Sequence, residues 1–162
     1  STRVRSSAAS DVYKRQVYMD TLNELPLIRN QVAAGINPSH PWSKRSFVTI
    51  RDFENTPFIT FDETFNMRAQ LAERFSAEHI YPKIAFEGAN CQFLSDLAAL
   101  SDNILVLPRP IIEYYAREPV VTLPFKPAFV WELTLIYPKN SFLSTASKAL
   151  IRHIQEYFSL FD

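Results

Sequence analysis

Residues 57–108 decide the fold of this chain and read PFITFDETFNMRAQLAERFSAEHIYPKIAFEGANCQFLSDLAALSDNILVLP. Three runs of strand-like composition, at 57–61, 83–87 and 103–107, alternate with two stretches of helical spacing. Strands that alternate with helices indicate βαβ units with a mostly parallel sheet and right-handed crossovers. The sequence therefore predicts an α/β fold.

Each of the two predicted helices has one apolar face. In the first helix, expected over residues 62–79, every fourth position is apolar: Met67, Leu71 and Phe75. In the second helix, the shared apolar face is formed by Phe93, Leu94, Leu97 and Ala98. We expect Leu97 to be buried between its helix and the sheet, so that Leu97→Ala costs about 2–5 kcal/mol.

The loops that follow the first two strands are the candidate ligand site. Ligands of open parallel sheets bind beyond the carboxyl ends of the strands, near helix N-termini whose free N–H groups attract anions. The candidate residues come from Asp62–Asn66 and Gly88–Gln92: Thr64, Phe65, Asn66, Ala89, Asn90, Cys91 and Gln92. A plainer interpretation is that Asp62 or Thr64 and Asn90 cap their helices. Cys91 is either a thiol activated at a helix N-terminus or a packed cysteine.

Shorter elements surround this unit. A strand is expected at 31–36, while residues 17–30 are ambiguous. Thr49 and Asp52 match a capping box and predict helical turns within 48–54. The remaining expected elements are a helix at 111–117, strands at 120–123 and 129–137, and an amphipathic helix at 144–158 with Leu150, Ile154 and Phe158 on one face.

The composition excludes several classes of protein. The 162 residues are 47% hydrophobic, enough for a folded core, but no apolar run is long enough to span a bilayer. A single cysteine excludes an intrachain disulfide and favours a reducing compartment such as the cytoplasm. The three histidines lack metal-ligand spacing, and the two glycines provide neither a phosphate loop nor a nucleophile elbow. We therefore expect no metal, no cofactor and no enzymatic activity.

The first 16 residues, STRVRSSAASDVYKRQ, differ from the rest of the chain. They have no hydrophobic period and resemble a translated sequencing adapter, so we predict that they pack against nothing. The alternative is a basic arm for nucleic acid. Without this tail the chain has 13 basic and 16 acidic residues, a net charge of −3, which gives no basic surface for nucleic acid.

Four segments, in order, resemble the C-terminal effector-binding domain of LysR-type transcriptional regulators. The family has an apolar strand before a His-Pro motif, a short helical segment before a "pfI" strand, a helix before a "GIa-lLP" strand, and a final strand and helix. The matching segments are 32–45, 48–59, 97–109 and 133–158. In one departure, family glycines are replaced by Ser101, Asp102 and Asn103, of which Asp and Asn tolerate left-handed backbone.

This resemblance implies two Rossmann-like subdomains of the periplasmic-binding-protein type, with an effector between them. Residues 57–124 would form the second subdomain almost completely, and 17–56 with 125–162 would form part of a truncated first. The implied function is sensing of a small, anionic effector. DNA contact would come only through an N-terminal domain absent from this chain, and the full-length regulator would be a homo-oligomer. The alternative is a solute-binding protein of a transporter.

Overall fold

The computed structural model describes residues 21–140 and 142–161, so the predicted tail at 1–16 lies outside the described residues. Its contacts divide the chain into two compact units. One is formed by residues 30–131, and the other by the residues up to 29 together with those from 132 onward. Strands β1 (Leu22–Ile36) and β6 (Val130–Pro138) continue from one unit into the other. How the chain divides between the two subdomains of the family fold stays a prediction.

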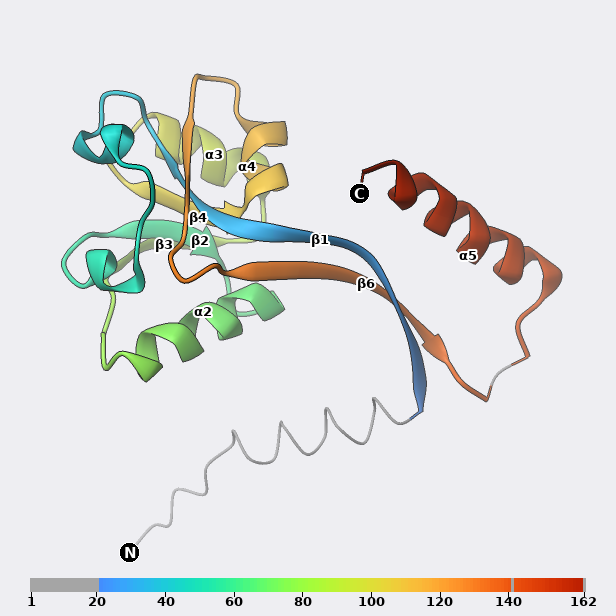
Figure 1. The fold of residues 1–162 in the computed structure, drawn as a ribbon. Helices are drawn as coiled ribbons and strands as arrows, with labels where there is room; N and C mark the ends of the chain where they lie inside the picture. The colour runs from blue at the N-terminus through green and yellow to red at the C-terminus, as the bar shows by residue number, and fades with distance from the viewer. Residues whose placement is uncertain (1–20, 141, 162) are drawn as a thin grey trace, which may run out of the picture. The chain divides into compact units, whose positions relative to one another are not determined.

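Residues 58–108 form the predicted alternation of strands and helices. The elements are β2 (Phe58–Phe61), α2 (Asn66–Ala77), β3 (Ile84–Gly88), α3 (Cys91–Ala99) and β4 (Ile104–Pro108). β2 pairs in parallel with both β3 and β4. In Figure 1, α2 covers one face of this sheet, while α3 and α4 (Arg109–Tyr115) cover the other. The prediction of parallel βαβ units is confirmed.

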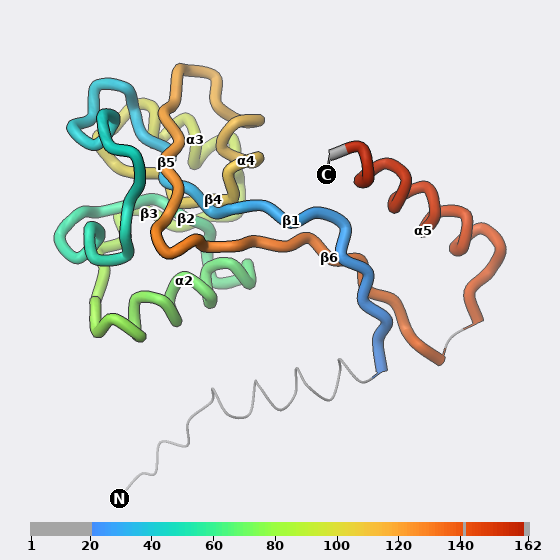
Figure 2. The backbone as a smooth tube through the Cα atoms, viewed as in Figure 1, coloured from blue at the N-terminus to red at the C-terminus, as the bar shows by residue number. Residues whose placement is uncertain are grey.

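The sheet continues beyond β4 with antiparallel strands. β1 lies between β4 and β5 (Val121–Pro124) and pairs antiparallel with both. It also pairs with β6, and Figure 2 shows these two strands side by side. Gly35 of β1 allows α4 to approach closely, because a Cβ atom at this position would lie 2.9 Å from Cγ2 of Ile112. β1 begins at Leu22, so the segment that the sequence left ambiguous is strand over most of its described part.

Helix α2 starts four residues later than predicted. Asp62 forms a turn instead, in which its Oδ1 accepts hydrogen bonds from the N–H (3.0 Å) and hydroxyl (2.5 Å) of Thr64. The predicted apolar face, Met67, Leu71 and Phe75, is buried as expected. At its C-terminus the helix ends in a Schellman motif, in which His79 has the left-handed φ of 57°.

The prediction for the face of α3 was wrong in detail. Leu94, Ser95 and Ala98 are buried, whereas Leu97 is only partly buried against the core and Phe93 is exposed. The exposed Phe93 ring instead contacts Phe86 of β3, with 5.4 Å between ring centroids. The helix is therefore rotated relative to the prediction, with Leu94 directed at the sheet.

An aromatic cluster joins the short helices after β1 to the sheet. Phe53 ends η2 (Ile50–Phe53) and stacks on Phe125 at 5.6 Å, and its ring edge meets Phe58 at 5.4 Å. The predicted capping box is present, since the Asp52 carboxylate accepts from both the N–H (2.7 Å) and the hydroxyl (2.8 Å) of Thr49. These contacts fix the segment between β1 and β2 on the core.

The second unit contains α5 (Thr145–Phe158), whose first turn is capped by the Ser144 hydroxyl. The helix has the predicted amphipathic pattern, yet none of its residues is buried and Leu150 is 59% exposed. The expected apolar face of Leu150, Ile154 and Phe158 thus forms part of no core within the described residues.

Candidate functional site: the carboxyl edge of the parallel strands

The two candidate loops lie at the same edge of the sheet. β2 and β3 are neighbouring parallel strands, so the turn after Phe61 and the turn after Gly88 leave the sheet on the same side. The N–H of Asp62 donates to the carbonyl oxygen of Gly88 at 3.2 Å, which joins the two loops directly. β4 is also parallel and ends at the same edge with Pro108, followed by Arg109. The structure therefore brings together the two loops that the topology predicted to be neighbours.

The first loop is held in one conformation by its own contacts. Thr64 uses both its N–H and its hydroxyl on Asp62, and the ring of Phe65 stacks on Phe61 at 4.1 Å. Thr64 and Asn66 are exposed, and Phe65 is partly buried. The expectation that Asp62 or Thr64 caps α2 was wrong: Phe65 is the capping residue, and no side chain accepts a hydrogen bond there. Backbone N–H groups at the start of α2 are thus not used by a side-chain cap.

The second loop carries Ala89 and Asn90 on the surface. Asn90 caps α3 as predicted, with its Oδ1 accepting from the N–H of Phe93 at 2.9 Å. Among the described residues, the Asn90 amide nitrogen donates to no acceptor, so this nitrogen supplies hydrogen-bond donors at the edge. Ala89 offers only its small side chain and backbone there.

The other two candidates in this loop serve the packing of α3. Gln92 donates from Nε2 to Asp96 Oδ1 at 2.8 Å and to the carbonyl oxygen of Tyr115 at 3.2 Å, which ties α3 to the end of α4. Cys91 is partly buried, and burial raises the pKa of its thiol. The N-terminus of a helix favours a thiolate, but at Cys91 the cost of burying the negative charge is larger than this effect. The position therefore does not produce an activated thiolate.

One ion pair at this edge was missed by the sequence analysis. Arg68 in the first turn of α2 donates from Nε to Oε1 of Glu87, near the end of β3. The two residues are 19 positions apart and belong to no common motif. Arg109, which follows β4 at the same edge, pairs with Glu113 of its own helix at 2.7 Å.

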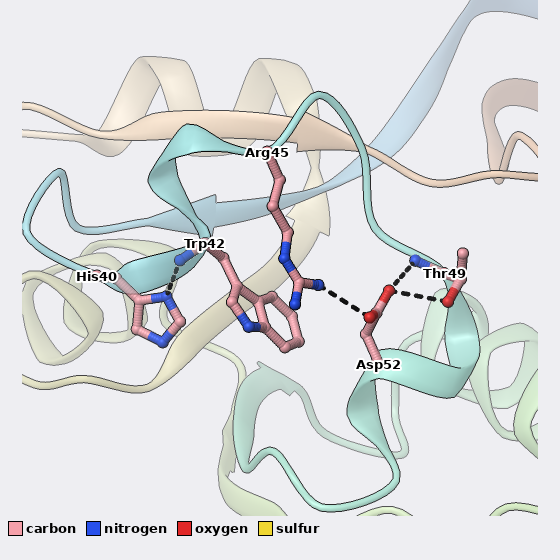
Figure 3. A network of polar contacts seen from close by, with 5 residues as sticks. All are labelled: His40, Trp42, Arg45, Thr49 and Asp52. Carbon is pink, nitrogen blue, oxygen red and sulfur yellow. Dashed lines mark hydrogen bonds and ion pairs between the residues drawn. The ribbon is translucent and has the colours of Figure 1, made fainter.

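A second polar network, drawn in Figure 3, supports the fold in the segment before β2. The guanidinium of Arg45 lies 4.3 Å from the ring centre of Trp42 and donates to Asp52 at 2.8 Å. Burial by itself raises the pKa of Asp52, but the hydrogen bonds from Thr49 and Arg45 outweigh it and leave the pKa below its usual value. Since each of these groups has a partner, we assign the network a structural role.

His40 belongs to the same network. Its Nδ1 accepts from the N–H of Trp42 at 3.1 Å, which caps the short helix η1 (Pro41–Lys44). Burial lowers the pKa of His40, an effect that Arg45 supports and Asp102 opposes. The lowered pKa and the hydrogen bond that Nδ1 accepts both favour the neutral imidazole.

The residues described contain no group of three or more His, Cys, Asp or Glu side chains arranged to hold a metal ion. In the same part of the chain, no helix has the length and apolar character needed to cross a membrane.

The statistical model of the LysR substrate binding domain family matches residues 12–159. Among curated proteins, the chain is 24% identical over 139 residues to the uncharacterized HTH-type transcriptional regulator YwbI of Bacillus subtilis strain 168, covering 85% of this chain and 46% of that protein. It is 22% identical over 134 residues to the transcriptional dual regulator GltC of the same organism, covering 82% and 45%. The chain thus spans about half the length of these relatives.

Solved structures show the same fold. The effector binding domain of QuiR in complex with shikimate superposes with a TM-score of 0.72 at 20% identity, covering 94% of this chain and 77% of that one. The regulatory domain of CcmR from Synechocystis PCC6803 in complex with 2-PG superposes with a TM-score of 0.74 at 16% identity, covering 85% and 67%. With the family model matching residues 12–159, the chain belongs to the LysR substrate-binding domain family, as the order of its sequence motifs predicted.

Proposed function

We propose that this chain is the part of a LysR-type transcriptional regulator that senses a small-molecule effector, and that Asp62–Asn66 and Gly88–Gln92 contact that effector. The observation that carries this proposal is the adjacency of the two loops at the carboxyl edge of the sheet, joined by the Asp62–Gly88 hydrogen bond. Two structures of the same fold contain small molecules, shikimate in QuiR and 2-PG in CcmR, which supports this class of ligand.

The chemistry of the edge favours an anionic group on the effector. Both α2 and α3 begin at this edge of the sheet, so the positive ends of their dipoles lie there, and the first turn of α2 has no side-chain cap for its N–H groups. The Asn90 amide adds side-chain donors, whereas the N–H and the hydroxyl of Thr64 are already donated to Asp62, so Thr64 shapes the first loop. A carboxylate such as that of shikimate would be bound by several N–H groups at once.

The regulatory mechanism that we propose is a shift between conformational populations. An effector that binds one arrangement of the domain more tightly than another biases the regulator toward that arrangement. In this proposal the regulator acts in the cytoplasm as a homo-oligomer, contacts DNA through a domain outside this chain, and catalyses no reaction. The family match favours this role over the solute-binding protein of a transporter.

The substitution Asn90→Asp tests the proposed site without removing the helix cap. The introduced carboxylate still accepts from the N–H of Phe93, but the substitution removes the amide donors and adds a negative charge. We expect the affinity for shikimate, measured by NMR titration, to fall by about tenfold or more, which corresponds to about 1.4 kcal/mol.

The matched control is Asn103→Asp, which makes the same chemical change before β4, at the opposite edge of the sheet. It should leave the affinity for shikimate unchanged. Equal affinities of the wild-type and Asn90→Asp proteins, or an equal loss in both variants, would refute the proposed site.

A further inference from the structure

The Arg68–Glu87 ion pair joins the two elements that carry the candidate loops. Arg68 is the third residue of α2 and lies two residues after the end of the first loop. Glu87 is the last residue but one of β3 and precedes the second loop directly. The bond from Arg68 Nε to Glu87 Oε1 therefore connects the two loops at their bases.

The position of Arg68 is unusual for a basic residue. The first turn of a helix carries the positive end of the helix dipole, so a positive charge there is disfavoured unless an anion neutralises it. The Arg68 side chain is only 22% exposed, less than any other basic side chain among the ion pairs of the described residues, and Glu87 is 35% exposed. The charge of Arg68 is consequently screened less by solvent than the charges of the other basic residues in these ion pairs.

β3 also needs support that the sheet alone does not provide. It is the terminal strand in the order β3-β2-β4-β1-β5, so it has a strand neighbour on one side only within the described residues. Its pairing with β2 is irregular, because Phe58 is opposite Ile84 but Ile59 is opposite Phe86, which leaves Ala85 as an extra residue. At the end of β3, the Asp62–Gly88 hydrogen bond and the Arg68–Glu87 pair hold the second loop beside the first.

We propose that Arg68 and Glu87 are positioning residues that hold the loops Asp62–Asn66 and Gly88–Gln92 at the spacing needed to bind one small effector. This inference rests on the proposed function of the two loops. Arg68 and Glu87 act through the loops and need not touch the effector. Loss of either charge lets the end of β3 move relative to the start of α2, and the two sets of N–H groups then no longer converge on one ligand.

The rate at which the Asp62 amide hydrogen exchanges with solvent, measured by NMR without any ligand, tests this positioning role. That amide spans the two loops, so it reports their separation. In Arg68→Met and in Glu87→Gln, we expect the exchange rate of the Asp62 amide to increase by about two- to fivefold. This factor corresponds to the loss of the interaction free energy that is typical of a partly exposed ion pair. The charge-swapped double variant, Arg68→Glu with Glu87→Arg, should restore the wild-type rate.

Arg45→Met is the matched control, because it removes another Arg–carboxylate pair from the same unit. It should affect exchange near Asp52 and leave Asp62 unchanged. Exchange at Asp62 that is the same in wild type and both single variants would overturn the positioning role. Acceleration that is equally large at core amides such as that of Val106 would also overturn it, because this would indicate general destabilisation.

A shikimate titration of the same variants separates this inference from the proposed function. Both single variants should bind more weakly by about the factor seen in exchange, and the double variant should recover. If Asn90→Asp leaves shikimate binding intact, the proposed site fails whatever the exchange rates are. If Asn90→Asp weakens binding but the Arg68 and Glu87 variants change neither exchange nor affinity, only the positioning role fails.

Discussion

Substitution of Leu94 and Leu97 by alanine, one at a time, tests how α3 packs on the sheet. Leu94 is fully buried, with 0% of its surface exposed, whereas Leu97 is partly buried at the rim of the same core. Leu→Ala removes the equivalent of about three methylene groups, or about 2.4 kcal/mol of transfer free energy at full burial. At Leu94 the cavity left behind adds to this loss, so we expect a decrease of about 3–5 kcal/mol in the free energy of unfolding.

At Leu97 the transfer loss is smaller, and solvent can fill the space that the side chain vacates. We expect a decrease of about 1–2 kcal/mol there. Urea unfolding of the two variants, monitored by circular dichroism, gives both values from the shift in midpoint at constant slope. A larger cost at Leu97 than at Leu94 would refute the orientation of α3, and equal costs would show that the sheet does not distinguish the two leucines.

Two further predictions concern local stability. Because the folded-state pKa of Asp52 is lowered, its carboxylate stabilises the fold above the unfolded-state pKa of about 3.9, and this contribution is lost as the pH falls through the folded value. Asp52→Asn should therefore lower the free energy of unfolding by about 1–2 kcal/mol at pH 7, and this loss relative to wild type should shrink below about pH 4. A loss that is constant from about pH 7 to pH 3 would contradict this prediction. His79→Gly should raise the free energy of unfolding by about 0.5–1 kcal/mol, because glycine adopts the left-handed φ of 57° without strain. A variant that unfolds at a lower urea concentration than wild type would disprove this prediction.

The alternation of strands and helices in residues 58–108 could be predicted because it depends on local spacing. The face of α2 was predicted correctly, since Met67, Leu71 and Phe75 recur at a single interval. In α3 the apolar residues span a wide face, so the pattern does not say whether Leu94 or Leu97 points at the sheet. That choice depends on the rotation of α3, which packing against the sheet and α4 determines.

Amphipathic spacing likewise shows where a helix is apolar, and does not show what covers that face. α5 has the predicted pattern, but none of its residues is buried. The start of α2 was displaced because Asp62 forms a turn with Thr64, a hydrogen bond that competes with helix formation and leaves no periodic signal.

Topology predicted that the two candidate loops lie at one edge of the sheet, and it did not predict the contacts of each side chain there. Parallel pairing of β2 and β3 requires that the two loops leave the sheet at one edge, and the cap formed by Asn90 follows from its residue type. The partners of Gln92 lie on α3 and at the end of α4, and the partner of Arg68 lies on β3. Such pairings between distant segments depend on the folded arrangement and have no counterpart in local sequence.

Chemical-shift mapping on the ¹⁵N-labelled chain during titration with shikimate tests most directly whether the two loops bind a small anionic effector. With a dissociation constant on the order of millimolar, backbone amides of Asp62–Asn66 and Gly88–Gln92 should shift together along one saturable binding curve. Amides near Thr49 and Asp52, in the structural network, should stay in place. Saturable shifts confined to any other part of the chain, or none in either loop at high concentrations of shikimate, would contradict the account.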